Sequence, residues 1–148
     1  MRPFMKHIGE IWRCANLYRT QQYRGQEIGS YQDSYIINIC KHPGIAQDGL
    51  AKLIYVHKSN VARQLSSLEE KGFVTRMADP EDKRVLRVYP TEKAKQALAH
   101  IRAVHKQWNE LIVEGLNEEE REIVAKYAEI LAESAKRIVG QEEEGGAE

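Results

Sequence analysis

Apolar side chains recur every three or four residues along most of this chain, which is the spacing of amphipathic helices. The first predicted helix covers residues 6–24, with apolar positions at Ile8, Ile11, Trp12, Ala15 and Tyr18. A second helix is expected to begin near Ser30, a residue type that caps helix N-termini, and to end at His42. It ends there because the residue before Pro43 is driven out of helical geometry.

Two shorter helices are predicted next, over residues 45–56 and 56–72, with Gly72 as the C-terminal stop. Their inward stripes are expected to be Leu50, Leu53 and Ile54 in the first helix and Val61, Leu65 and Leu68 in the second. The turn YVHK between them carries an inward-facing Val56. Two amphipathic helices joined by such a short turn have the layout of a helix-turn-helix.

Only one region has the β-branched and aromatic content of strands. Segments 73–78 and 85–89 flank the polar stretch DPEDKR, and we expect them to form a β-hairpin with a loop of several residues. Pro90 closes the hairpin, and Thr91 can cap a long helix that follows, carrying Ala94, Leu98, Ile101, Val104, Trp108, Leu111 and Ile112.

The remainder of the chain is predicted to be helical. Asn117 followed by Glu120 forms a variant of the capping box and starts a final helix carrying Ile123, Val124, Tyr127, Ile130, Leu131 and Ile138. Residues 141–148 are acidic and low in complexity, and we expect a solvated tail. The predicted fold class is therefore mainly α with one small β-hairpin.

Composition adds limits to this picture. The 148 residues are 42% hydrophobic and 30% charged, as expected for one globular domain. No apolar run has membrane-spanning length, and the start lacks the apolar core of a signal peptide, so we expect a cytoplasmic protein with no membrane partner. The net charge is zero, but residues 52–87 hold eight Lys and Arg against five Asp and Glu, whereas 117–148 hold four against ten. This segregation permits a locally positive surface.

The second short helix carries one polar stripe, because Asn60, Arg63, Gln64 and Ser67 lie at offsets of zero, three, four and seven. Arg can bind guanine bidentately, and Asn or Gln can bind adenine in the same way. Lys58 and Ser59 stand at the helix start, where side chains and backbone amides can contact phosphate. The stripe therefore predicts a recognition helix for double-stranded DNA, and the alternative is an ordinary solvated helix face.

A β-hairpin directly after a recognition helix is typical of a wing. We expect Arg84 at its tip to enter the minor groove, and Asp82 to hold Arg84 by a charge-assisted hydrogen bond. Lys83 and Arg76 are candidate phosphate contacts, with Arg87 as a further candidate. The alternative is a solvated turn.

The run from Gly44 to Thr91 resembles the MarR family of transcription regulators. The matching pieces are LAKLIYVHKSNVARQLSSLEEKGFVTR and DPEDKR, with its Asp-x-Arg wing signature. The resemblance implies a winged helix-turn-helix domain over 30–90. It also implies dimerisation helices over 1–29 and 91–140, followed by the acidic tail over 141–148.

A homodimer also follows from the amount of apolar surface. The helices outside the winged domain carry more apolar side chains than a small domain needs to cover, namely Trp12, Trp108, Leu111, Ile112, Tyr127, Ile130 and Leu131. A two-fold dimer would read a pseudo-palindrome with half-sites about one helical turn apart. The alternative is that these side chains pack within one chain.

Family resemblance further implies a switch, either a small aromatic or phenolic ligand or thiol oxidation. Trp12, Tyr18, Tyr31 and Tyr35 could line a ligand crevice, and otherwise belong to the core. Cys14 is the candidate redox residue; otherwise Cys14 and Cys40 are expected to be small buried hydrophobes. The histidines show no metal-ligand spacing, so we expect no metal and no cofactor.

Three classes of function differ in the residues that they require. An enzyme would need a nucleophile with a base, a phosphate-binding glycine loop or a metal cluster, and the sequence shows none of them. A winged-helix protein-interaction module would be expected to carry apolar residues in place of Asn60, Arg63 or Gln64. The sequence thus predicts a DNA-binding regulator that acts as a repressor, with the interaction module and a redox-sensing regulator as alternatives.

Overall fold

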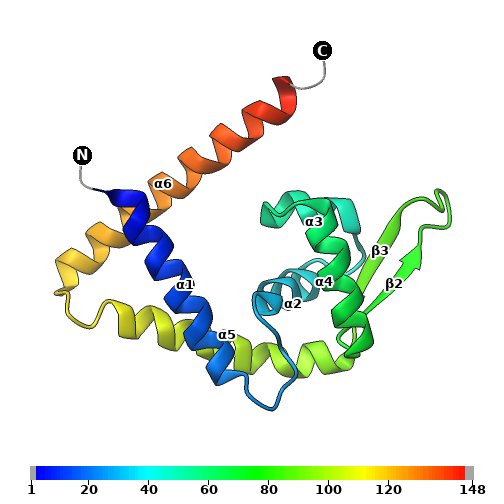
Figure 1. Ribbon diagram of the computed structural model, residues 1–148, viewed down its shortest axis with the longest axis horizontal. Helices are drawn as coiled ribbons and strands as arrows, with labels where there is room; N and C mark the ends of the chain where they lie inside the picture. The colour runs from blue at the N-terminus through cyan, green and yellow to red at the C-terminus, as the bar shows by residue number, and fades with distance from the viewer. Residues whose placement is uncertain (1–2, 146–148) are drawn as a thin grey trace. The chain divides into compact units, whose positions relative to one another are not determined.

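The computed structural model describes residues 3–145, and the chain divides into two compact units, Met1–Trp108 and Asn109–Glu148. Within the described residues, six helices and a small antiparallel sheet confirm the predicted mainly α class (Figure 1). The elements are α1 (Phe4–Gln22), α2 (Gln32–Lys41), β1 (Ile45–Ala46), α3 (Gln47–Ile54), α4 (Lys58–Glu70), β2 (Val74–Ala78), β3 (Leu86–Pro90), α5 (Glu92–Ile112) and α6 (Glu118–Gly145).

The core of the first unit is centred on α4. Its predicted apolar stripe of Val61, Leu65 and Leu68 is fully buried, as helical spacing requires. The other fully buried side chains around it come from neighbouring elements and include Ile36, Ile39, Leu50, Phe73, Val88 and Ile101. Burying each such side chain stabilises the fold by about 1.5–3 kcal/mol, so this stripe anchors α4 and leaves its opposite face open.

Local backbone geometry sets both ends of α4. Tyr55 adopts a left-handed conformation with φ of 55° and ends α3, after which the Val56 N–H donates to the Ala51 carbonyl at 3.1 Å. The cap of α4 is His57, whose Nδ1 accepts from the Ser59 N–H at 3.2 Å. The C-cap of α4 is Lys71, and Gly72 follows it in the left-handed conformation, with φ of +82°. This confirms the predicted stop at Gly72.

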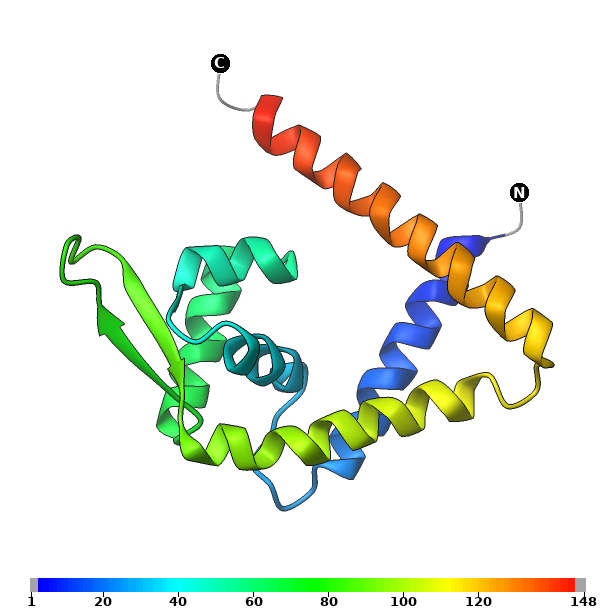
Figure 2. The ribbon, with the colours of Figure 1, turned by 180° about the vertical axis from the view of Figure 1, so that it is seen from behind.

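The wing is the antiparallel hairpin of β2 and β3, which lies beside α4 in both ribbon views (Figure 1 and Figure 2). Arg76 pairs with Val88 across the hairpin, and β1 pairs with the other edge of β3 through Ile45 and Val88. After the hairpin, the Thr91 hydroxyl accepts from the Ala94 N–H at 3.4 Å, so Thr91 caps α5 as predicted.

Three local expectations were wrong. The two-residue strand β1 occupies positions predicted to be helical. The N-cap of α2 is Tyr31, with φ of 63°, and the Ser30 hydroxyl instead accepts from Asn16 Nδ2 at 2.8 Å. Leu53, expected to face inward, is exposed. The end of α2 at the residue before Pro43 is confirmed, because His42 is its C-cap.

The second unit contains α6. Its capping box is confirmed, because the Asn117 N–H donates to Glu120 Oε2 at 2.9 Å and the Glu120 N–H donates to Asn117 Oδ1 at 3.0 Å. Its backbone continues to Gly145, and residues 146–148 of the predicted acidic tail lie outside the described residues. None of the helices described, α6 included, is long and apolar enough to span a membrane.

Candidate nucleic-acid interface

The solvent-facing side of α4 presents Asn60 and Arg63, one helical turn apart and both exposed. Arg63 Nη2 donates to Asn60 Oδ1, which holds the two planar side chains together. Lys58 lies at the start of the helix, and its Nζ is 3.4 Å from Asp48 Oδ2 in a pair that is mostly solvent-exposed. Such a pair contributes little and leaves Lys58 available for another anion. Ser59 Oγ lies 2.7 Å from His57 Nδ1 in the cap.

The other two residues of the predicted stripe, Gln64 and Ser67, are only half-exposed. Gln64 Oε1 and Ser67 Oγ both accept from Gln32 Nε2 of α2, at 3.0 and 3.1 Å. The stripe therefore consists of two pairs in the structure. The open pair, Asn60 and Arg63, is exposed, whereas Gln64 and Ser67 are hydrogen-bonded to α2. Sequence reasoning missed Gln32, because its partners lie more than thirty residues away along the chain.

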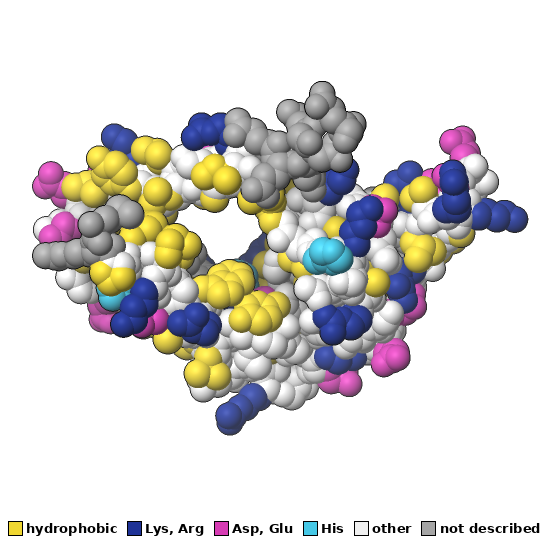
Figure 3. All heavy atoms as spheres, turned by 45° about the horizontal axis from the view of Figure 1, so that its top comes forward, with side chains coloured by type: hydrophobic (Ala, Val, Ile, Leu, Met, Phe, Trp, Pro, Cys, Tyr) yellow, Lys and Arg dark blue, Asp and Glu magenta, His cyan; other side chains and the backbone are white. Residues whose placement is uncertain are grey.

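The tip of the wing carries Arg84 with 91% of its side chain exposed. Arg84 Nε donates to Asp82 Oδ1 at 3.0 Å and Nη2 donates to Oδ2 at 3.1 Å, so the predicted pairing is confirmed. These hydrogen bonds also lower the pKa of Asp82, which stays ionised as a partner. Lys83 beside it is exposed, and Lys and Arg side chains project from the wing end of the molecule (Figure 3).

Arg76 and Arg87, offered as phosphate contacts, have partners within the protein. Arg76 Nη2 lies 3.2 Å from Glu69 Oε1 and 3.1 Å from Ser66 Oγ, both on α4. Arg87 Nε donates to Asp79 Oδ2 at 2.7 Å, and this hydrogen bond is the main cause that lowers the pKa of Asp79. Both arginines therefore stabilise the wing, and their predicted phosphate contacts stay predictions.

A cavity of about 700 Å³ lies within the first unit. Three of the four predicted ligand-contacting aromatics line it, namely Trp12, Tyr31 and Tyr35. Trp12 stacks on Tyr31 with ring centroids 5.6 Å apart, whereas Tyr18 packs against Trp108 at 5.3 Å. Asn60 and Gln64 also line the cavity, so it reaches α4.

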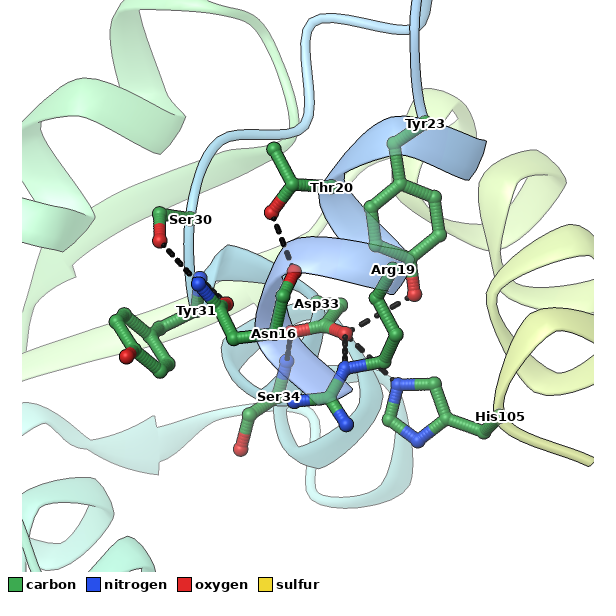
Figure 4. A network of polar contacts seen from close by, with 9 residues as sticks. All are labelled: Asn16, Arg19, Thr20, Tyr23, Ser30, Tyr31, Asp33, Ser34 and His105. Carbon is green, nitrogen blue, oxygen red and sulfur yellow. Dashed lines mark hydrogen bonds and ion pairs between the residues drawn. The ribbon is translucent and has the colours of Figure 1, made fainter. Parts of the chain in front are cut away.

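A buried polar network forms one wall of this cavity (Figure 4). Asp33 of α2 is 2% exposed, and its Oδ2 accepts from Tyr23 Oη at 3.0 Å and lies 2.8 Å from His105 Nε2 of α5. Arg19 Nε of α1 lies 3.1 Å from the same oxygen. The Arg19 N–H is not aligned with a described hydrogen-bond acceptor, so this contact is an ion pair without a directed hydrogen bond.

The charge of Asp33 depends on these partners. Burial alone would raise the pKa of Asp33, but hydrogen bonds from His105 and Tyr23 and the charge of Arg19 together hold it below its ordinary value. Burial and the neighbouring Asp33 carboxylate raise the pKa of Tyr23 far above its usual range, so Tyr23 remains a neutral donor. The network therefore ties α1, α2 and α5 together through one anion.

The cysteines differ in their surroundings. Cys14 is exposed, so the expectation that it is buried was wrong, and its proposed redox role stays a prediction. Cys40 is half-buried, and burial raises the pKa of its thiol. In the part of the chain that the structure describes, no group of three or more His, Cys, Asp or Glu side chains is placed to hold a metal ion.

The chain is similar in sequence and in fold to known proteins of one family. A family model described as MarR family matches residues 32–86. The HTH-type transcriptional regulator YybA of Bacillus subtilis (strain 168) is 28% identical over 125 residues, covering 84% of this chain and 83% of that protein. A crystal structure of MarR is 30% identical, with a TM-score of 0.86 and coverage of 94% and 95%. A MarR-type regulator from Listeria monocytogenes, complexed with a 26mer DNA, shares the fold at 21% identity, with a TM-score of 0.85 and coverage of 98% and 97%.

Proposed function

Since the chain belongs to the MarR family of transcription regulators, we propose that it binds a pseudo-palindromic DNA operator as a homodimer and represses the adjacent gene. The observation that carries the proposal is the exposed Arg84, oriented by Asp82, on a wing beside the exposed Asn60 and Arg63 of α4. These side chains offer hydrogen-bond donors on two neighbouring elements. Such an arrangement suits the major groove and an adjacent minor groove.

The contacts follow from the chemistry of the base edges. An α-helix fits the major groove, where the Arg63 guanidinium can donate to guanine O6 and N7 and the Asn60 amide can pair with adenine. Arg84 is suited to the minor groove, where narrow A·T segments concentrate negative potential. Lys58 and Lys83 would contact phosphates and add affinity without sequence information.

The homodimer is supported by apolar side chains that a single chain leaves exposed. On α1 these include Phe4, Ile8, Ile11 and Trp12, and on α6 they include Ile123, Tyr127, Ile130, Leu131 and Ile138. A two-fold partner would cover such side chains and present two copies of α4. Half-sites about 10 base pairs apart would then face the two helices.

The cavity supports release by a ligand. Its aromatic wall of Trp12, Tyr31 and Tyr35 suits a small aromatic or phenolic molecule, and its polar wall includes Arg19. A ligand that binds more tightly to the protein with α4 in one orientation than in another would shift the population toward that orientation. Repression follows from the DNA-bound state, because a dimer on promoter DNA excludes polymerase. Exposed Cys14 keeps thiol oxidation open as an alternative trigger.

The test is selection of bound sequences from random duplex DNA at near-physiological salt. The parent is expected to enrich a palindrome, and a variant with Arg63→Ala and Arg84→Ala is expected to lose it. Arg137→Ala on α6 removes a surface arginine elsewhere and serves as the matched control. No enrichment by the parent, or enrichment indifferent to the double change, would contradict DNA reading by this surface and favour a protein-interaction module.

A further inference from the structure

The side-chain amide of Gln32 is buried and fully hydrogen-bonded, with only 3% of the residue exposed. Its Oε1 accepts from the Gly29 N–H at 2.9 Å and from Lys71 Nζ at 2.8 Å. Its Nε2 donates to Gln64 Oε1 at 3.0 Å and to Ser67 Oγ at 3.1 Å. A carboxamide has two donor hydrogens and two acceptor lone pairs, so these four contacts use its whole capacity.

The orientation of this amide is determined by its partners. A backbone N–H and an ammonium can only donate, so the Gln32 carbonyl must face Gly29 and Lys71. Its NH₂ group must then face α4, and Gln64 has to turn its own carbonyl toward Gln32. Gln64 Nε2 is thereby left on the other side of that amide, free of the Gln32 contact.

The three α4-side partners of Gln32 follow the helix. Gln64, Ser67 and Lys71 are spaced by three and four residues, so they lie along one side of α4 and its C-cap. Apolar burial holds α4 in place but is not directional, whereas hydrogen bonds depend steeply on angle. The buried stripe determines which face of α4 points to solvent, and within that limit this row of contacts sets the rotation of α4 about its axis, and with it the direction in which Arg63 points.

The contacts of Gln32 connect α4 to the rest of the first unit. Asp33, the next residue, contacts Arg19 and Tyr23 of the α1 region and His105 of α5. One turn of α2 thus binds α4 on one side and the two flanking helices on the other. If those helices form the dimer, Gln32 also sets how each α4 faces its half-site.

We infer that Gln32 is a positioning residue for base reading, which sets the rotation of α4 through Gln64, Ser67 and Lys71. The inference rests on the proposed DNA-binding function. A substitution that lets α4 rotate should weaken base contacts more than phosphate contacts. Base contacts need directed hydrogen bonds, whereas phosphate contacts are mainly electrostatic. The quantity to measure is the ratio of affinities for the selected operator and for a scrambled duplex at one salt concentration.

Two substitutions at Gln32 separate positioning from simple packing. Gln32→Met has similar length but forms none of the four hydrogen bonds. Gln32→Glu keeps the acceptors for Gly29 and Lys71, and its second oxygen can accept from the Ser67 hydroxyl and from a flipped Gln64 amide. Val104→Ala removes buried side-chain atoms from α5, a helix that makes none of the four hydrogen bonds of Gln32, and is the control for lost stability alone.

Gln32→Met is expected to lower the operator-to-scrambled ratio about tenfold or more while affinity for the scrambled duplex stays within about twofold. Gln32→Glu is expected to keep the ratio near the parent's, and Val104→Ala to keep it despite a lower melting temperature. Should Gln32→Met fail to fold, Lys71→Met, which removes one contact at the C-cap, is expected to lower the ratio by a smaller factor.

A ratio unchanged in Gln32→Met, or in Lys71→Met where the former does not fold, would overturn the inference. So would an equal fall in Val104→Ala, or a failure of Gln32→Glu to retain the ratio. If the parent itself prefers no duplex, the proposed function fails and the inference with it. If the parent prefers its operator and the variants do too, only the inference fails.

Discussion

Replacing Asp33 with alanine removes the carboxylate of α2 that side chains of α1 and α5 both contact. Oδ2 of Asp33 accepts from Tyr23 Oη and from His105 Nε2, and it neutralises Arg19, whose side chain is only 11% exposed. Deleting one partner of a buried ion pair costs about 3–5 kcal/mol, because the other charge is left uncompensated. The two further donors do not add in full, since all belong to one network. We expect Asp33→Ala to lower the free energy of unfolding by about 4 kcal/mol.

At this chain length a loss of 1 kcal/mol shifts the melting temperature by about 2–4 °C, so Asp33→Ala should melt about 8–16 °C lower. Urea and thermal unfolding followed by circular dichroism at one fixed protein concentration would measure this, because dimer stability depends on concentration. Glu133→Ala breaks an exposed pair with Lys136 and should change stability by about 0.5 kcal/mol or less. Adding Arg19→Met to Asp33→Ala should recover part of the loss. A loss below about 1 kcal/mol in Asp33→Ala would refute the buried-anion account.

Three further predictions follow from individual contacts. Because folding lowers the pKa of Asp33 from its ordinary 3.8, its carboxylate stabilises the fold above that pH, and the contribution disappears as the pH falls through the lowered value. Asp33→Asn should therefore flatten the decline of unfolding free energy as the pH falls below 3.8, and an unchanged slope would contradict this. Asp82→Ala should lower the operator-to-scrambled affinity ratio about two- to tenfold in fluorescence anisotropy by releasing Arg84, whereas an unchanged ratio would show that orientation of Arg84 is irrelevant. Asn117→Ala breaks both bonds of the α6 capping box and should cost about 0.5–2 kcal/mol in urea unfolding; no measurable loss would argue against a stabilising cap.

Features with a local signal were predictable from the sequence. The stripe of Val61, Leu65 and Leu68 repeats at helical spacing and is buried as expected. The Asp82–Arg84 pair was predictable for the same reason, because two residues of one turn can meet whatever the rest of the fold does. The capping box at Asn117 likewise involves residues only three apart.

Features that depend on distant partners were missed. Strand β1 has only two residues and exists because it pairs with β3, which lies about forty residues further on. Gln32 and Asp33 are polar residues in a first helical turn, a position that is usually exposed, and no local pattern marks them as buried. Their partners include Lys71 and His105, which only the tertiary fold brings close.

The division of the polar stripe has the same origin. Asn60, Arg63, Gln64 and Ser67 share one helical face by spacing, and the sequence treats them as equivalent. Packing against α2 makes them different, because Gln32 forms hydrogen bonds with Gln64 and Ser67, whereas Asn60 and Arg63 remain exposed. Base reading is therefore expected to depend first on the open pair.

Hydroxyl-radical footprinting on the selected operator tests the central claim most directly. The account predicts two protected half-sites about 10 base pairs apart on one face of the duplex, each flanked by a protected minor groove. Arg84→Ala should remove only the flanking protection, because Arg63 and Asn60 still occupy the major groove. A single continuous footprint, no footprint, or flanking protection that persists in Arg84→Ala would contradict DNA reading by α4 and the wing.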